Sequence, residues 1–325
     1  MNNKKKVVVT DNLFENLSIE KAILEPLGLE IVDGQCRTPE TLIPVVANAD
    51  FVMTQFSPVN AQVIAAMTRC RVIVRYGIGV DNVDIKAAAA KNIPVCNVPD
   101  YCIDEVADHT LALILAATRQ VFPTIVTVKS GRWKTPVPFA AMHALKNMTV
   151  GLVGLGKIGR EVASRLKAFK CPLVGFDPAM APDRISAAGC RPVELERLYA
   201  ESDIISLHCP STEKTRYMIN AKSLSAMRPG VIIVNTSRGT LIKTPDLVEA
   251  LRAGKVSAAA LDVTDPEPIN TDSPLLGMDN VIITSHIASV SPDAVKNLRE
   301  QVAGIVAMAV RGAKLPNIVN GVKQA

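Results

Sequence analysis

The sequence has few aromatic residues and no long apolar run. Aromatic residues make up 4% of the 325 residues, and the net charge of +5 is spread along the chain, with no basic block after Lys4 to Lys6. The stacking side chains and basic patch of a nucleic-acid-binding protein are therefore missing. A membrane span needs roughly 20 apolar residues, and the most apolar stretch, residues 111–120, is interrupted by Arg119 and Gln120. We expect neither nucleic acid nor a membrane as a partner.

Cysteine is present, but not in the patterns that indicate disulfides or metal sites. The seven cysteines are scattered, with no C-x-x-C pair, which favours reduced, mostly buried thiols and predicts no metal site. The amino terminus carries three lysines before a short β-branched run. That run lacks the length and the cleavage site of a signal peptide. We therefore expect a cytoplasmic protein.

Short Val/Ile-rich runs alternate with helical patterns along the whole chain, which predicts a parallel α/β architecture. The length and the 48% hydrophobic content favour two domains. The first hundred residues contain five predicted strands. A mostly helical stretch, 101–129, and a proline-rich loop, 131–138, precede six further predicted strands, the number in a complete dinucleotide-binding sheet. A single helix is predicted after Ser291, its expected cap, and Pro292.

One glycine-rich turn has the context of a dinucleotide site. Gly154, Gly156 and Gly159 follow a predicted strand and open a helical pattern. The glycines permit a tight turn, a close approach to pyrophosphate and close helix packing, and the helix amino terminus favours the phosphate charge. Asp177 ends the next strand, where a carboxylate grips the adenosine ribose and repels a 2'-phosphate. Because no Arg or Lys follows before Arg184, NAD is favoured over NADP.

Three chemically distinct residues follow three of the predicted strands: Arg238, Glu267 and His286. The carboxyl ends of parallel strands meet along one edge of a sheet, beside the cofactor. Arg238 can hold a carboxylate and a carbonyl oxygen in a forked contact. His286 can act as acid or base, and Glu267 can stabilise its charged form. Each residue alone has an ordinary structural explanation, but together they predict reduction of a 2-oxo acid.

With these motifs, the chain resembles the D-isomer-specific 2-hydroxyacid dehydrogenases over essentially its whole length, in the branch of phosphoglycerate dehydrogenases and glyoxylate-hydroxypyruvate reductases. The resemblance implies a Rossmann NAD-binding domain (residues 101–290) inserted in a flavodoxin-like substrate domain (1–100 and 291–325). It implies a homodimer through the NAD-binding domain, with Trp133 near the partner's active site. It also implies that backbone N–H groups near Gly77 to Gly79 hold the substrate carboxylate.

The site residues expected from the motifs and the resemblance form three sets. The catalytic set is Arg238, Glu267 and His286. The cofactor set is Gly154, Gly156, Lys157, Ile158, Gly159, Asp177, Pro210, Thr236, Ser237, Arg238, Asp262, His286, Ala288 and Ser289. The substrate set is Tyr76, Gly77, Ile78, Gly79, Arg238 and His286. The other histidines, His109, His143 and His208, are expected to be structural or adjacent to the cofactor.

The substrate stays open among small 2-hydroxy and 2-oxo acids. Phosphoglycerate is possible, but the segment 54–60 offers no Arg or Lys for its phosphate, so glyoxylate and hydroxypyruvate are at least as well supported. The segment NVPDYC, with Tyr101, resembles the D-lactate dehydrogenases, which keeps lactate open as a substrate. A different class also fits, because the C-terminal binding protein corepressors resemble these enzymes and sense NAD without needing turnover. Steady consumption of NADH with 2-oxo acids separates the two classes.

Overall fold

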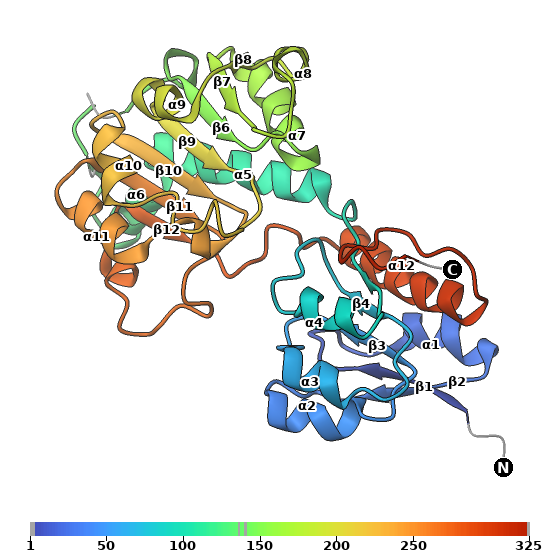
Figure 1. Cartoon of the computed structure of the whole chain (residues 1–325). Coiled ribbons are helices and arrows are strands. Elements are labelled where there is room, and N and C mark those ends of the chain that lie inside the picture. Colours follow the sequence, from blue (N-terminus) through green and yellow to red (C-terminus); the bar gives the residue numbers. More distant parts are fainter. Residues whose placement is uncertain (1–3, 136, 140–141, 324–325) are drawn as a thin grey trace. The chain divides into compact units, whose positions relative to one another are not determined.

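The computed structural model describes residues 4–135, 137–139 and 142–323. The chain divides into two compact units, which we call unit 1 (Met1–Tyr101 with Ser291–Ala325) and unit 2 (Cys102–Val290). Unit 2 is therefore an insertion in the sequence of unit 1. Each unit has its own parallel sheet and its own cores (Figure 1).

Unit 1 is a doubly wound sheet of five parallel strands in the order β2-β1-β3-β4-β5, which is the flavodoxin-like order. The central strands are continuous Val/Ile/Phe runs because both faces of the sheet are covered. The elements are β1 (Lys5–Val9), α1 (Ser18–Leu24), β2 (Leu29–Asp33), α2 (Pro39–Val46), β3 (Phe51–Thr54), α3 (Ala61–Ala66), β4 (Ile73–Arg75), α4 (Ile85–Ala90), β5 (Val95–Cys96) and α12 (Pro292–Val310).

The helix α12 completes the core of unit 1 although it follows unit 2 in the sequence. Its first turn is capped as the sequence predicts, with Ser291 Oγ accepting from the backbone N–H of Ala294 at 3.0 Å. Val302 and Val306 are buried against the strands. A buried ion pair links α12 to α1, with Arg299 Nη2 2.6 Å from Glu20 Oε2. The return of the chain thus contributes both apolar packing and a specific polar contact.

Unit 2 is a seven-stranded parallel sheet in the order β12-β11-β10-β9-β6-β7-β8. The order around β6 is that of a Rossmann sheet. Its strands are β6 (Val150–Val153), β7 (Leu173–Phe176), β8 (Arg191–Pro192), β9 (Ile204–Leu207), β10 (Val231–Asn235), β11 (Val256–Leu261) and β12 (Val281–Ile283). The sequence predicts six strands here. The additional strand, β8, is a two-residue edge strand with no apolar run, so hydrophobic periodicity does not reveal it.

Helices cover both faces of the sheet in unit 2. On one face, α5 (Ile103–Thr118) and α7 (Lys157–Leu166) enclose one apolar core, and on the other face α9 (Leu195–Glu201), α10 (Ala221–Ala226) and α11 (Thr244–Arg252) enclose a second. The short helix α8 (Pro182–Ala187) precedes β8. The predicted fold class, two doubly wound parallel-sheet domains, is confirmed.

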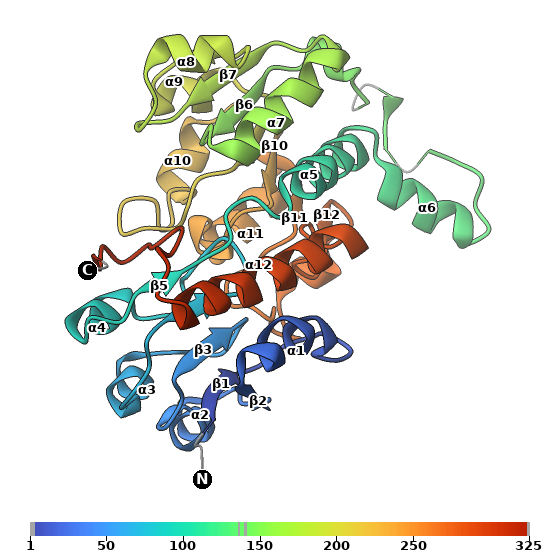
Figure 2. The ribbon, with the colours of Figure 1, turned by 90° about the vertical axis from the view of Figure 1, so that its right-hand side faces the viewer.

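The helix α6 (Val121–Lys129) follows α5 after a sharp bend and extends away from the sheet of unit 2 (Figure 2). The bend is 63°, and Gln120 has a left-handed backbone conformation there. In the part of the chain that the structure describes, no single helix has both the length and the apolar character for a membrane span. Among these residues, only α5 and α6 taken together have that length and apolar character, and they are bent relative to each other.

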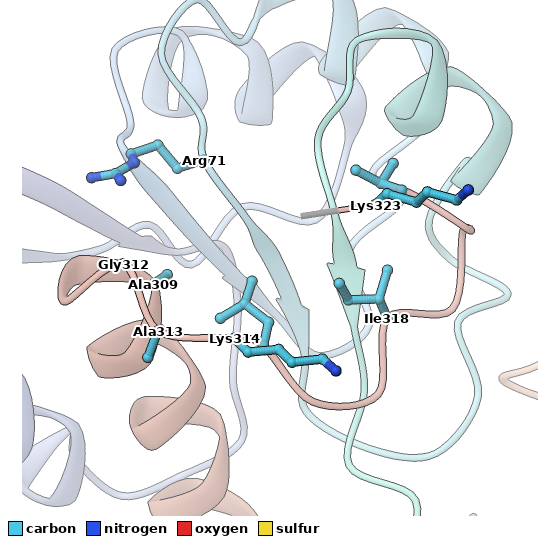
Figure 3. A pocket seen from close by; sticks show the side chains of 9 residues that line it. Arg71, Ala309, Gly312, Ala313, Lys314, Ile318 and Lys323 are labelled. Carbon is cyan, nitrogen blue, oxygen red and sulfur yellow. The ribbon is translucent and has the colours of Figure 1, made fainter. Parts of the chain in front are cut away.

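A cavity of about 780 Å³ lies in unit 1 beside the carboxyl end of α12 (Figure 3). Apolar side chains line part of it, and three cationic residues, Arg71, Lys314 and Lys323, line the rest. Arg71 precedes β4, whereas Gly77 follows it. The cavity therefore lies at the opposite end of β4 from the predicted substrate segment.

Candidate functional site

The turn between β6 and α7 is so tightly packed that glycine is required at two positions. Gly154 has φ +93°, and a Cβ there would lie 2.7 Å from the backbone N of Cys209. A Cβ at Gly159 would lie 2.2 Å from the carbonyl oxygen of Gly154. At Gly156, in contrast, a Cβ would meet nothing within 4 Å. The middle glycine therefore faces open space, which is what a ligand approaching the backbone needs.

The residues around this turn fit a dinucleotide. Gly156 caps the ten-residue helix α7 without any side-chain acceptor for the first-turn N–H groups, which is the arrangement that favours a phosphate. Asp177 is half-buried beside the turn. Its Oδ2 accepts from the backbone N–H of Leu155 at 2.8 Å and its Oδ1 from that of Ala179 at 2.9 Å. These bonds fix the carboxylate, and its remaining lone pairs can accept from ribose hydroxyls.

The next strand end, after β9, forms the other wall of the turn. A Cβ at Gly154 would lie 2.7 Å from the carbonyl carbon of His208. His208 Nε2 lies 2.9 Å from Ser206 Oγ, and burial lowers the pKa of His208 to about 4. His208 is therefore neutral near pH 7 and supports the turn. Ser237 Oγ donates to the carbonyl oxygen of Cys209 at 2.6 Å, which ties the start of the Arg238 loop to the same strand end.

His286 and Glu267 form a direct pair, with His286 Nδ1 2.5 Å from Glu267 Oε1. Both side chains are about one third exposed, at 32% and 37%. Burial acts to raise the pKa of Glu267, but hydrogen bonds from His286 and from the backbone of Thr264, with the charges of His286 and Arg238, together outweigh it. The pKa of Glu267 is therefore lower than its ordinary value. Glu267 is therefore ionised near neutral pH. The carboxylate can accept an N–H from Nδ1.

Arg238 belongs to the same group of side chains. Its positive charge is one of the causes that lower the pKa of Glu267, and its Nη1 donates to the carbonyl oxygen of Ser237 at 2.8 Å. The following residue, Gly239, packs directly on the Glu267 loop, because a Cβ there would lie 1.9 Å from the carbonyl oxygen of Thr264. The ends of β10, β11 and β12 thus bring together the guanidinium, the carboxylate and the imidazole that the sequence singles out.

Asp262, at the end of β11, holds the backbone that carries His286. The side chain of Asp262 is 1% exposed. Its Oδ1 accepts from Thr284 Oγ1 at 2.6 Å and from the N–H of Ile287 at 3.0 Å, and its Oδ2 accepts from the N–H of Ala288 at 2.9 Å. His286 has φ +56°, which is uncommon for a residue with a side chain. The sequence reasoning expects Asp262 to contact the cofactor and does not foresee this anchoring role.

The predicted substrate segment lies in unit 1. The Tyr76 side chain is 1% exposed, and its hydroxyl donates to Glu20 Oε1 at 3.1 Å. Gly77 has φ +143°, and a Cβ there would lie 1.5 Å from Arg75 Nη1, so the Arg75 guanidinium lies across this glycine. Sequence reasoning did not single out Arg75. The role of the segment in substrate binding stays a prediction that concerns its backbone, because the tyrosine ring is enclosed in the core.

The remaining predicted cofactor residues surround the same strand ends in unit 2. Lys157 and Pro210 are exposed, Ile158, Thr236 and Ser289 are half-buried, and Ala288 is buried. Their contacts with a cofactor stay predictions.

Comparison with known proteins places this arrangement in a family. The model of "D-isomer specific 2-hydroxyacid dehydrogenase, NAD binding domain" matches residues 111–288, which is more than half of the chain. The chain belongs to the D-isomer specific 2-hydroxyacid dehydrogenases. The match lies within unit 2, which therefore contains the NAD-binding domain of this family.

Relatives of this dehydrogenase family align along nearly the whole chain. The D-3-phosphoglycerate dehydrogenase of Mycobacterium leprae is 37% identical over 315 residues, 97% of this chain and 58% of that protein. The glyoxylate reductase of Thermococcus litoralis is 34% identical over 325 residues, 98% of this chain and 97% of that protein. The chain thus spans about 58% of the length of the phosphoglycerate dehydrogenase and nearly all of the glyoxylate reductase.

Solved structures show the same dehydrogenase fold. The D-lactate dehydrogenase from Aquifex aeolicus, crystallised with NAD and lactic acid, superposes with a TM-score of 0.86 at 28% identity, covering 98% of this chain and 99% of that one. The family assignment and the NAD-binding domain confirm the resemblance that the glycine turn and the three strand-end residues suggest.

Proposed function

We propose that the chain is an NAD-dependent dehydrogenase that interconverts a small D-2-hydroxy acid and its 2-oxo acid. The observation that carries the proposal is the pair His286 Nδ1 and Glu267 Oε1 at 2.5 Å, with the charge of Arg238 acting on the same carboxylate. A cation, an acid/base pair and a dinucleotide-binding turn in one sheet are the parts that this reaction needs.

In this proposal each residue has one task. NAD, when bound, would supply the hydride to C2 in reduction and take it up in oxidation. Arg238 binds the substrate carboxylate and polarises the C2 oxygen. Because Glu267 engages Nδ1, the nitrogen of His286 that exchanges a proton with the C2 oxygen is Nε2. In reduction this nitrogen gives its proton to the oxygen, and in oxidation it removes the hydroxyl proton. In both directions the other proton stays on Nδ1, which donates to Glu267.

The expected substrates are small 2-oxo acids, because of what Arg238 can bind. Arg238 recognises a carboxylate next to a carbonyl, which glyoxylate, hydroxypyruvate, pyruvate and 3-phosphohydroxypyruvate all carry. The segment 54–60 has no cation for a phosphate, which favours the unphosphorylated acids. The matching relatives include both a phosphoglycerate dehydrogenase and a glyoxylate reductase, so the substrate is decided by assay.

The deciding experiment is steady-state oxidation of NADH by the full chain with these four 2-oxo acids. We expect turnover with at least one of them, and we expect loss of turnover in Glu267→Ala. A matched control is Glu249→Ala on α11, whose side chain is 73% exposed and remote from the strand ends. NADH binding without turnover of any of these acids would contradict the proposal and favour an NAD-sensing binding protein of the corepressor type.

We also propose that the chain forms a homodimer through unit 2. The helix α6 exposes Phe122, Ile125 and Val126 by 45–47%, and Trp133 after it is 91% exposed. Apolar side chains grouped in this way on one exposed helix indicate a protein interface. The expected partner is a second copy of the chain, because the resemblance implies a homodimer through the NAD-binding domain. Light scattering should give the dimer mass for the wild type and a monomer for Phe122→Asp with Val126→Asp. A wild-type monomer would contradict this.

A further inference from the structure

The helix α5 contacts two of the three strand ends that carry the proposed catalytic residues. Thr110 Oγ1 lies 2.9 Å from Thr236 Oγ1, two residues before Arg238. The preceding residue, His109, has its Nε2 3.0 Å from Thr284 Oγ1, two residues before His286. Neither contact is part of the cofactor turn or of the chemistry proposed above. Two consecutive residues of one helix therefore fix two catalytic loops.

The direction of the hydrogen bonds around His109 follows from the chemistry of its partners. The Asp262 carboxylate is an acceptor, and Thr284 has one hydroxyl proton, which it donates to Asp262 Oδ1 at 2.6 Å. The oxygen of Thr284 must therefore accept from His109, so Nε2 of His109 carries a proton. His109 Nε2 also lies 3.6 Å from Asp262 Oδ1. The donor chain runs from His109 through Thr284 to Asp262.

The end of this chain is the carboxylate that holds His286. Asp262 accepts the N–H groups of Ile287 and Ala288, and its backbone carbonyl accepts the N–H of His286 at 2.8 Å. These bonds maintain the left-handed conformation of His286, which is unfavourable for a residue with a side chain. The orientation of the His286 ring thus depends on the position of Asp262.

We propose that His109 is a positioning residue for His286, acting through Thr284 and Asp262. His109 orients the Thr284 hydroxyl toward Asp262, and it provides a polarised N–H close to a carboxylate that is almost entirely withdrawn from water. The proposal rests on the proposed function in so far as His286 is the acid/base group. Its structural part, the holding of residues 286–288, is measurable without turnover.

The test uses the full chain and four variants. His109→Leu removes the donor, and His109→Gln keeps an N–H at about the reach of Nε2. Thr284→Val removes the middle of the chain, and the double variant His109→Leu with Thr284→Val tests coupling. We expect kcat to fall about tenfold in each single variant that breaks the chain and no further in the double variant. KM for the 2-oxo acid should change by less than about threefold, because Arg238 binds that acid, and His109→Gln should keep most of the activity.

Hydrogen exchange provides the readout that does not need catalysis. The amides of Ile287 and Ala288 should exchange faster in His109→Leu and in Thr284→Val than in the wild type, and at the wild-type rate in His109→Gln. His143→Leu is the matched control, because His143 is an exposed histidine of the same unit and should change neither kcat nor exchange. Absence of wild-type turnover would count against the proposed function alone, since exchange would still report on the loop.

Three results would overturn the inference. The first is unchanged exchange at residues 287 and 288 in His109→Leu. The second is additive loss of kcat in the double variant, because independent sites add and members of one chain do not. The third is equal effects of the Leu and Gln replacements, which would show that ring packing rather than the N–H is what matters. If His109→Leu does not fold, Thr284→Val and His109→Gln still decide the question by exchange.

Discussion

His286 Nδ1 and Glu267 Oε1 lie 2.5 Å apart although the two residues are 19 positions apart in the sequence. The contact joins the end of β12 to the loop after β11. It engages one ring nitrogen, and in the proposed function the other nitrogen exchanges the proton with the substrate. It also makes the carboxylate part of the acid/base unit, because the histidine lowers the pKa of Glu267 despite its partial burial.

Removing the charge of Glu267 should change the pH dependence of catalysis. The lowered pKa of Glu267 keeps its carboxylate ionised and able to accept from Nδ1 near neutral pH. In Glu267→Gln that carboxylate is absent at every pH, so the acidic decline in the rate that follows its protonation in the wild type should be absent. The measurement is kcat against pH with saturating NADH. Glu249→Gln is the exposed control, and a profile that stays in place would exclude the pairing as the source of the pH dependence.

The lowered pKa of Glu267 also predicts how the pair responds to acid. A carboxyl group whose pKa is lower in the folded protein contributes stability above its unfolded pKa and loses that contribution as pH falls through the folded value. The wild type should therefore lose more free energy of unfolding than Glu267→Gln when the pH drops from about 6 to below about 4. Urea unfolding at both pH values checks this. Equal losses in the two proteins would contradict it.

Substitutions at two glycines of the turn should have different effects, one on stability and the other on NADH binding. In Gly159→Ala the added Cβ meets backbone at 2.2 Å, so the variant should lose about 1–3 kcal/mol of stability through overpacking. In Gly156→Ala the Cβ meets open space, so the melting temperature should stay near the wild-type value while NADH affinity falls. Thermal unfolding and fluorescence titration with NADH measure the two effects. A Gly156→Ala variant that binds NADH as well as the wild type would place the pyrophosphate elsewhere.

Asp177 should set the choice of cofactor. Its carboxylate is fixed beside the turn by two backbone N–H groups, and a hydrogen bond to a charged group contributes about 1.5–3 kcal/mol. Asp177→Ala should therefore lower the ratio of kcat/KM for NADH to that for NADPH by about tenfold or more. Asp183→Ala, in the exposed first turn of α8, is the control. An unchanged ratio in Asp177→Ala would remove the assignment.

Much of the fold and the position of the site were predictable from local patterns. Val/Ile runs alternating with helical segments indicate parallel sheets covered on both faces. The glycines between β6 and α7 lie between a strand and a helix, which is typical of a dinucleotide-binding turn. Arg238, Glu267 and His286 each follow a strand, and parallel strands place such residues at one edge of the sheet. The topology therefore brings distant residues together without any knowledge of their contacts.

The supporting contacts were not predictable, because they depend on side chains far apart in the sequence. His109 and Thr284 are 175 residues apart, and Glu20 and Arg299 are 279 apart. Neither pair has a local signal. The edge strand β8 is too short for periodicity to detect, and the bend between α5 and α6 depends on the backbone of a single residue, Gln120. The anchoring role of Asp262 follows only from its burial and its donors.

The central claim is that His286 exchanges the proton while hydride moves. It is tested most directly by kcat for reduction of the best 2-oxo acid in His286→Asn, compared with the wild type and with His143→Asn as the exposed-histidine control. General acid/base catalysis contributes about 10²–10⁴-fold. We predict that kcat falls by at least about 100-fold in His286→Asn and stays at the wild-type value in His143→Asn. A His286→Asn enzyme that turns over at close to the wild-type rate would contradict the account.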